Sequence, residues 1–340
     1  MRLRPGFEVY WRDRGASQIG VDPRCAVRLE GLSDAEQRLL DRLPTALDGD
    51  ELLVRGQELG IPEQDVTGLL ERLVAARVLV AELPPGDPDP DDVYWHLAAA
   101  AGQPRPAPRS AAMVEIRGVD QLGLRIACVL SQAGVGTVLL RDERLVLAED
   151  LGAGVFRESD VGAVRERVGL AVLRSVCPLV GVSAPSGARP DLVVVVDHGV
   201  VDPVPLRILM REDVAHLPVL VRELDVVVGP LVRPGLGVCL RCVDLHRCDQ
   251  DPRWPAVATQ IAARPPRGVE TSLAWLGAAL AAHQALAMLD GRPVAVDGAS
   301  LEVSASDPLP ARREWAVHPE CGCAPTTFDV APDAQATSRR

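Results

Sequence analysis

The 340-residue chain contains no lysine and no asparagine, so all 36 of its basic residues are arginine. A phosphate-binding loop of the Walker type requires a lysine, and so does Schiff-base catalysis. The sequence therefore excludes both kinds of enzyme. Codon bias in a GC-rich genome explains the absence itself without changing that chemical consequence.

Positive charge is also scarce, because 36 basic residues stand against 47 acidic ones and give a formal net charge of -11. An acidic chain is poorly suited to sequence-independent binding of nucleic acid. No apolar run approaches the roughly 20 residues that span a bilayer, and residues 1–6 lack the apolar stretch of a signal peptide. We expect no nucleic-acid partner, no membrane partner and a cytoplasmic location.

A proline-rich stretch divides the chain. Residues 83–110 carry PPGDPDPDD and GQPRPAPRS, which is typical of a linker around a short segment, Val93–Ala101. It separates a small domain, residues 1–82, from a larger one, residues 111–326. We expect residues 327–340 to form a disordered tail. The length suits two domains, and an apolar fraction of 47% is enough to build their cores.

The small domain reads as three short strands followed by three helices. The strand candidates are 7–12, 17–21 and 26–29, and Ser33 with Glu36 forms a capping box at the first helix. The third helix begins near Pro62, with apolar residues at helical spacing: Val66, Leu69, Leu70, Leu73 and Val74. This α+β pattern resembles the winged-helix peptide clamps of the PqqD-like leader-recognition domains.

The resemblance implies that a leader peptide adds as a strand beside the third strand and lies against the third helix. The candidate peptide-binding residues are Ala26, Val27, Arg28, Leu29, Leu69, Arg72, Leu73 and Ala76. Two alternatives are open at this point: a winged helix that binds DNA, or one that only packs on its neighbour.

The large domain begins with a βαβ unit. Residues 113–117 are a strand, 118–123 a turn, 124–133 a helix and 136–140 a second strand that leads to Asp142. Further strand candidates follow at 192–196, 218–221 and 226–228. The predicted fold class is α/β, with a Rossmann-like, mostly parallel sheet.

The turn after the first strand of this unit has the outline of a nucleotide-binding GxGxxG loop with a defect. Gly118 and Gly123 are the outer glycines, but Asp120 stands where the middle glycine lets phosphate approach the backbone. Its carboxylate takes up space and repels phosphate. The two remaining glycines are then explained by a tight turn for helix packing.

This region resembles the ThiF/MoeB-like adenylating enzymes. Positions matching their layout are Gly118, Leu122, Gly123, Ala133–Gly136, Asp142 and Asp160–Gly162. Ala153 stands where the family has a catalytic arginine, Arg165 where it has a lysine, and Asp197–Gly199 lacks the family asparagine. The resemblance implies a degenerate nucleotide site of Gly118, Asp120, Gly123, Asp142, Arg165 and Asp197, with no catalytic residue and no tight ATP binding.

Two pairs of cysteines stand far apart in the chain, Cys239 with Cys242 and Cys321 with Cys323. Four thiolates at C-x2-C and C-x-C spacing predict a closed structural zinc site, which has no open position to activate water. Eight cysteines without a signal peptide argue against disulfides. His246 and Cys248 are alternative ligands.

The sequence segments around these cysteines resemble the ThiF-like cyclodehydratase family of azole-containing peptide (TOMM and bacteriocin) biosynthesis. These segments are Pro230–Cys242, Asp251–Trp254 and His318–Cys323. The resemblance implies a partner protein that binds the leader of a ribosomal precursor and presents it to a YcaO-type, ATP-dependent cyclodehydratase that makes azolines. The apolar helix 273–289 is either buried or the seam of a homodimer. The rival functions are an active adenylyltransferase and a zinc-stabilised DNA-binding regulator.

Overall fold

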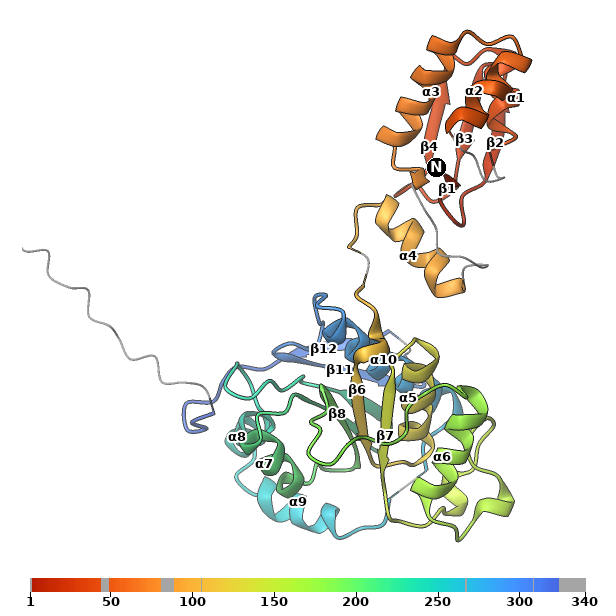
Figure 1. The fold of residues 1–340 in the computed structure, drawn as a ribbon. Coiled ribbons are helices and arrows are strands. Elements are labelled where there is room, and N and C mark those ends of the chain that lie inside the picture. Colours follow the sequence, from red (N-terminus) through yellow and green to blue (C-terminus); the bar gives the residue numbers. More distant parts are fainter. Residues whose placement is uncertain are drawn as a thin grey trace, which may run out of the picture. The chain divides into compact units, whose positions relative to one another are not determined.

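The computed structural model describes residues 2–43, 49–80, 89–104, 106–266, 268–307 and 309–323, with only the backbone of residues 49 and 50. The chain divides into two compact units, Met1–Ala107 and Pro108–Arg340, which are described separately (Figure 1). The predicted tail, residues 327–340, lies outside the described residues.

The first unit contains a three-stranded antiparallel sheet in the order β2-β3-β4, a two-stranded pair β1-β5, and three helices that follow the sheet in the chain. The strands are β1 (Arg2–Leu3), β2 (Val9–Asp13), β3 (Ala16–Ile19), β4 (Val27–Glu30) and β5 (Leu79–Val80). The helices are α1 (Asp34–Leu40), α2 (Gly49–Glu58) and α3 (Glu63–Ala75). The three-stranded sheet followed by three helices is the order of elements that the sequence predicts for this unit.

Local chemistry fixes these helices. The capping box forms at α1, with Glu36 N donating to Ser33 Oγ at 3.2 Å and Ser33 N donating to Glu36 Oε2 at 2.7 Å. On α3 the residues at helical spacing divide by exposure: Leu69 and Leu73 are buried, whereas Val74 is 48% exposed. The buried set packs with Ile19 of β3 into a core of its own.

Part of the predicted linker is a helix. Residues Pro90–Ala100 form α4, capped by Asp89, whose side chain accepts from Asp92 N at 2.8 Å, and begun by proline at the first helical position. Leu97 and Ala100 pack against the core of the first unit. Proline therefore starts an element here instead of interrupting one.

The second unit is built on a seven-stranded sheet in the order β12-β11-β10-β9-β8-β6-β7. The strands are β6 (Met113–Arg117), β7 (Thr137–Arg141), β8 (Leu192–His198), β9 (His216–Val221), β10 (Asp225–Val228), β11 (Ala299–Ser304) and β12 (Ala311–Glu314). The strands β7, β6, β8 and β9 are parallel, as predicted. The pairings of β10, β11 and β12 are antiparallel. For β9 and β10 the reason is that the three residues between them are too few for a parallel crossover.

Helices lie on both faces of this sheet (Figure 1). They are α5 (Gln121–Gln132), α6 (Arg165–Val176), α7 (Pro203–Arg211), α8 (Leu240–Gln250), α9 (Trp254–Ala262) and α10 (Thr271–Leu289), with short 3-10 turns η1 (Arg109–Ala111), η2 (Ala148–Asp150) and η3 (Glu158–Asp160). Strand β8 shows why both faces of the sheet are covered by helices. Its Val194 and Val196 belong to the core that α5 and α10 share, whereas its Val193 and Val195 pack against α7. Both faces of the parallel strands are thus apolar and covered.

Helix α10 is, within the described residues, the one helix long and apolar enough to cross a membrane, but half of its most apolar window is buried inside the unit. It packs on α5 and on strands β9, β10 and β11. Small residues permit this approach, since a Cβ on Gly277 would stand 2.9 Å from Val226 Cγ1. The helix therefore has the contacts of a core element.

Candidate functional site

The turn between β6 and α5 is shaped by its two glycines. Gly118 has a φ of +87°, and a Cβ there would overlap the carbonyl oxygen of Val196. Gly123 lies in the first turn of α5 instead of in the loop, and its Cβ would overlap the carbonyl oxygen of Gly118. Both glycines are therefore required by the packing of strand, turn and helix, whether or not a nucleotide binds.

Asp120 caps helix α5. Its Oδ1 accepts hydrogen bonds from Leu122 N at 2.8 Å and Gly123 N at 2.9 Å. Its Oδ2 lies 2.5 Å from Nε2 of His198. His198 is the last residue of β8, the parallel strand next to β6. With 3% of its surface exposed, Asp120 is a buried carboxylate held between a helix N-terminus and a histidine.

Two opposing effects act on the Asp120 carboxyl group. Burial disfavours its charged form, but the hydrogen bond and charge of His198 favour it, as do Gly123 N and the nearby Arg165. The net result is a pKa below the ordinary value, so the group is ionised at neutral pH.

Arg165 joins the same site from the start of α6. Its guanidinium is 2% exposed and binds Asp150 in a bidentate manner, with both N···O distances at 2.8 Å. Its Nη1 lies 3.3 Å from Asp142 Oδ2. Asp142, a member of the predicted degenerate nucleotide site, accepts from Val119 N at 2.7 Å and from Arg144 Nε at 2.8 Å. The charges of this site are therefore satisfied within the chain.

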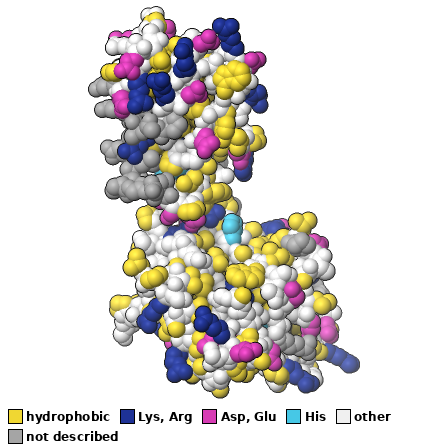
Figure 2. All heavy atoms as spheres, turned by 90° about the vertical axis from the view of Figure 1, so that its right-hand side faces the viewer, with side chains coloured by type: hydrophobic (Ala, Val, Ile, Leu, Met, Phe, Trp, Pro, Cys, Tyr) yellow, Lys and Arg dark blue, Asp and Glu magenta, His cyan; other side chains and the backbone are white. Residues whose placement is uncertain are grey.

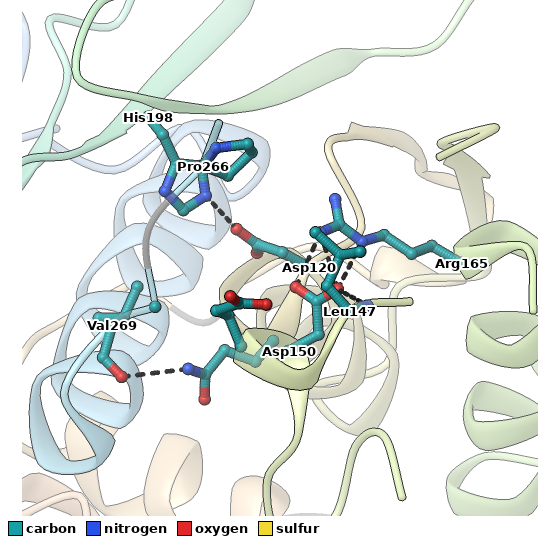
Figure 3. A pocket seen from close by; sticks show the side chains of 10 residues that line it. Asp120, Leu147, Asp150, Arg165, His198, Pro266 and Val269 are labelled. Atoms are coloured by element: carbon teal, nitrogen blue, oxygen red, sulfur yellow. Dashed lines mark hydrogen bonds and ion pairs between the residues drawn. The ribbon is translucent and has the colours of Figure 1, made fainter. Parts of the chain in front are cut away.

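A small pocket marks the centre of the site (Figure 3). Its lining is Asp120, Gln121, Leu147, Glu149, Asp150, Arg165, His198, Pro266, Gly268 and Val269. Gln121 Nε2 donates to the carbonyl of Val269 at 3.1 Å, which ties the segment before α10 to α5. Three of the lining side chains, Asp120, Glu149 and Asp150, are carboxylates, which repel phosphate.

The site differs in two ways from the predicted one. Asp197 does not line the pocket, since its Oδ2 accepts from Asp202 N at 3.1 Å. Asp150 and His198 were not predicted to belong to it. The signal for His198 was its place at the carboxyl end of a parallel strand, where the ligands of such sheets gather.

The four paired cysteines meet between the start of α8 and residues 321–323. Their Sγ atoms are 3.4 Å apart for Cys239 and Cys321, 3.3 Å for Cys242 and Cys323, and 3.9 Å for Cys239 and Cys242. A tetrahedral zinc with Zn–S bonds of about 2.3 Å requires sulfur atoms about 3.8 Å apart. These spacings suit four metal ligands and exclude a disulfide, in which the sulfur atoms are about 2 Å apart.

The donor set also fits a cation. Burial and the neighbouring thiols raise the pKa of Cys321 and raise that of Cys323 to about 12, so these thiols are neutral on their own. A metal ligand is the thiolate, and Zn²⁺ would supply the positive charge that four thiolates need. The cysteines thus fit the metal in number, type and spacing.

The predicted alternative ligands lie elsewhere. Cys248 is not among the four. His246 donates from Nε2 to the carbonyl of Ala316 at 2.9 Å and stacks edge-on against His318. His318 donates from Nε2 to Asp249 at 3.0 Å, and its Nδ1 accepts from Glu320 N at 3.1 Å. With their ring nitrogens so used, these histidines brace the metal-binding segment on α8.

The predicted peptide groove divides into a floor and an edge. Leu29, Leu69 and Leu73 lie in the core of the first unit at 3%, 2% and 0% exposure. Ala26, Val27 and Arg28 lie at or before the start of β4, the last strand of the sheet, and Ala76 ends α3. Arg72 Nη2 reaches from α3 to the carbonyl of Glu30 at 3.1 Å. Helix α3 therefore runs beside the free edge of β4.

The direction of the β4 backbone groups follows from the hydrogen-bond pattern. Gly20 N donates to Glu8 O, so residues Gly20 and Gln18 direct their backbone groups toward β2. Ser17 and Ile19 direct theirs toward β4, to Leu29 and Val27. The backbone N–H and C=O of Arg28 and Glu30 consequently point away from the sheet. A shallow hollow lined by Gln18, Val21, Pro23, Ala26 and Arg28 adjoins this edge.

The geometry defines the class of the second unit: a parallel α/β sheet with a glycine turn, an acidic residue after the second strand and a four-cysteine site, which is the ThiF/MoeB-like fold. The full chain has the fold of the microcin C7 biosynthetic enzyme MccB. It matches E. coli MccB with AMPCPP and MccA at a TM-score of 0.66 and 17% identity, covering 95% of this chain and 99% of that one.

Two further structures show the same likeness. MccB in complex with N-formylated MccA matches at a TM-score of 0.65 and 15% identity over 95% of this chain and 99% of that one. PaaA matches at a TM-score of 0.65 and 15% identity over 91% and 98%. No protein-family model matches the chain, and no curated protein matches its sequence.

Proposed function

We propose that this chain is the leader-binding partner subunit of an azoline-forming cyclodehydratase. Its winged-helix first unit clamps the leader of a ribosomal precursor peptide and presents the core to a YcaO-type, ATP-dependent subunit. The observation that carries the proposal is the edge of β4, where the backbone N–H and C=O of Arg28 point outward, while the outward C=O of Glu30 accepts from Arg72 of α3. A peptide strand can add there through main-chain hydrogen bonds.

The chain would contribute proximity. A leader held on one subunit makes the meeting of core peptide and enzyme intramolecular and raises its effective concentration. Main-chain recognition of the leader leaves the sequence of the core unrestricted. The likeness to MccB, which has been solved in complex with MccA, supports peptide binding by a protein of this fold.

The proposed function differs from MccB in nucleotide binding. MccB has been solved with ATP and with AMPCPP, which weighs against a fold unable to bind ATP. In this chain, however, Asp120 caps the helix N-terminus, and Glu149 and Asp150 line the same pocket. We propose that ATP does not bind here and that the cyclodehydratase subunit supplies it.

Two structural roles complete the proposal. Zn²⁺ held by Cys239, Cys242, Cys321 and Cys323 fastens the C-terminal segment to α8. A second copy of the chain would cover the exposed stripe of α10, Trp275, Ala279 and His283, which lies at i, i+4 and i+8. Arginine and carboxylate side chains are interspersed on the face drawn in Figure 2, and the net charge of -11 is unfavourable for nucleic-acid binding, in keeping with the proposed cytoplasmic protein without a nucleic-acid or membrane partner.

The second candidate is an active adenylyltransferase, favoured by the nucleotide-bound MccB structures. It requires ATP binding and exchange of pyrophosphate into ATP in the presence of a peptide. The two functions separate in one calorimetric titration series, in which the full chain is mixed with leader peptides encoded nearby and, separately, with Mg-ATP. Leader binding without ATP binding supports a partner subunit, whereas ATP binding without leader affinity restores the adenylyltransferase.

The mode of binding is tested at Arg28. Arg28→Pro removes an outward N–H without breaking the β3–β4 ladder, because that group does not bond β3. We expect at least a tenfold loss of leader affinity. Arg28→Ala removes the same side chain but keeps the N–H and is the matched control. Equal affinities for the two variants would exclude strand addition at this position.

A further inference from the structure

The three-stranded sheet of the first unit turns one face toward the core and the other toward the surface. Side chains alternate along β4, so Leu29 is buried in the core, whereas Arg28 points to the opposite face and is exposed. The strand register places Tyr10 of β2, Gln18 of β3 and Arg28 in one row across the sheet. The face that carries this row is called the outer face below.

A hollow on the outer face adjoins the edge of β4. Arg28 and Gln18 line it together with the apolar side chains of Val21, Pro23 and Ala26. Val21 is 72% exposed, although it is a large apolar residue. The hollow therefore combines one cationic side chain with an exposed apolar lining.

The charge of Arg28 is available to a ligand. Within the described residues its guanidinium makes no hydrogen bond or ion pair, whereas Arg24 binds Asp22 at 2.6 Å and Arg12 Nη1 donates to Gln18 Oε1. An exposed arginine alone is ordinary. This arginine, however, also carries the outward N–H and C=O of the strand edge, to which a peptide strand can add.

The side of the edge that faces α3 has less to offer an added side chain. The leucines there, Leu29, Leu69 and Leu73, are packed in the core of the unit. Arg72 of α3, the helix that runs along β4 in Figure 1, donates to the outward carbonyl of Glu30. An added strand is therefore centred on Arg28, and its side chains are distinguished mainly on the outer face.

We propose that the outer face selects the bound peptide by its chemistry: an acidic side chain opposite Arg28, and an apolar side chain two positions away that lies over Val21 and Ala26. The inference rests on the proposed function, because it needs a peptide strand at the β4 edge, and it names the class of that peptide. Residues paired across neighbouring strands point to the same face, where opposite charges stabilise the pairing. Main-chain bonds hold the strand, and contacts at alternate side chains give specificity.

The test begins with a selection of peptides by the full chain. A displayed library of random decapeptides, panned against the immobilised wild-type chain, should enrich aspartate or glutamate two positions from a large apolar residue. Panned against Arg28→Glu, the same library should enrich lysine or arginine in place of the acidic residue and keep the apolar one. Arg28→Lys keeps the charge and should select as the wild-type chain does.

Fluorescence anisotropy with a synthetic peptide of the enriched sequence then measures the effect. Arg28→Glu should bind this peptide at least about fivefold more weakly than the wild-type chain, and replacing the acidic residue of the peptide by lysine should restore the affinity. The difference should shrink in about 0.5 M sodium chloride, because the charges are exposed.

The apolar part of the hollow is tested at Val21. Val21→Glu should weaken binding of the enriched peptide severalfold, because it puts a charge where the apolar side chain would lie. Val54→Glu is the matched control, since Val54 is an exposed valine of α2, a helix that packs on α1 and α3. It should bind as the wild-type chain does, and circular dichroism verifies that each variant is folded.

Three outcomes would overturn the inference: the same charge preference in the wild-type chain and Arg28→Glu, enriched peptides without the acidic and apolar pair, or no enrichment by a chain that binds leader peptides in calorimetry. The proposed function fails differently, through a wild-type chain that binds no leader peptide in calorimetry or that binds ATP. Calorimetry on the same preparations therefore keeps the two failures distinguishable.

Discussion

At the residue scale, the candidate nucleotide site is filled by buried, paired charges of the chain itself. Asp120, Asp142 and Asp150 face His198, Arg144 and Arg165, and each carboxylate accepts at least one backbone or guanidinium hydrogen bond. Buried charges of this kind persist only when they are paired and hydrogen-bonded. The network therefore has a structural function of its own, independent of any nucleotide.

The pKa of Asp120 predicts a particular pH dependence. Because its pKa in the folded chain is lowered from 3.8, its ionised form stabilises the fold above that pH, and this contribution disappears as the pH falls below about 4. We expect Asp120→Asn to be less stable than the wild-type chain at pH 6, and the difference to shrink below pH 4. Urea unfolding at several pH values measures it. A difference that does not change with pH would contradict the ionised pair.

The glycines of the turn predict a loss of stability unrelated to ligands. Gly123→Ala places a methyl group against the carbonyl oxygen of Gly118, so backbone must move, at a cost of about 2–4 kcal/mol. Gly134→Ala, where a Cβ meets no atom within 4 Å but the φ is +87°, is the control for backbone strain alone and should cost about 1 kcal/mol. Thermal denaturation distinguishes the two.

At the element scale, the cysteine site joins helix α8 to a segment that follows β12. Cys239 is the N-cap residue of α8 and Cys242 lies in its first turn, while Cys321 and Cys323 flank Gly322, which has a φ of +65°. Residues about 80 positions apart are thus brought together in one small cluster, which packs with Val232, Val238 and Val243. A metal held by the four thiols would add a link between these segments.

Removal of the metal should loosen this segment. We expect one zinc per chain by atomic emission, and Cys242→Ser should lose it and lower the melting temperature of the second unit by about 5 °C or more. Cys248→Ser, which changes a cysteine outside the cluster, should leave zinc content and melting unchanged. Full zinc in the Cys242 variant would show that the four thiols are not the ligands.

At the scale of the whole molecule, the two units have separate cores with no residue in common. Leu73 belongs to the first core and Leu173 to the second, both with 0% exposure. We expect Leu73→Ala and Leu173→Ala each to cost about 2–5 kcal/mol, because each leaves a cavity. In calorimetry each variant should shift one transition and leave the other in place. A common shift would show that the units unfold together.

The sequence by itself determined the elements and the kinds of chemistry. Strand β6 was predicted residue for residue, because the glycine turn that begins at Gly118 marks its end, and the capping box at Ser33 was predicted because it depends on residues three apart. The cysteine pairs were recognisable because metal-ligand spacing is local in the chain. The defect at Asp120 was readable because a GxGxxG turn tolerates no side chain at that position.

Only the tertiary structure decided how distant residues combine. No local pattern shows that His198 meets Asp120, that Asp150 binds Arg165, or that Asp197 turns away, since these depend on strand order and on the course of the loops. The sequence predicted repulsion of phosphate by Asp120, whereas the fold shows that the carboxylate caps α5 and pairs with His198. Burial and strand register, which bring together residues far apart in the chain, made that difference.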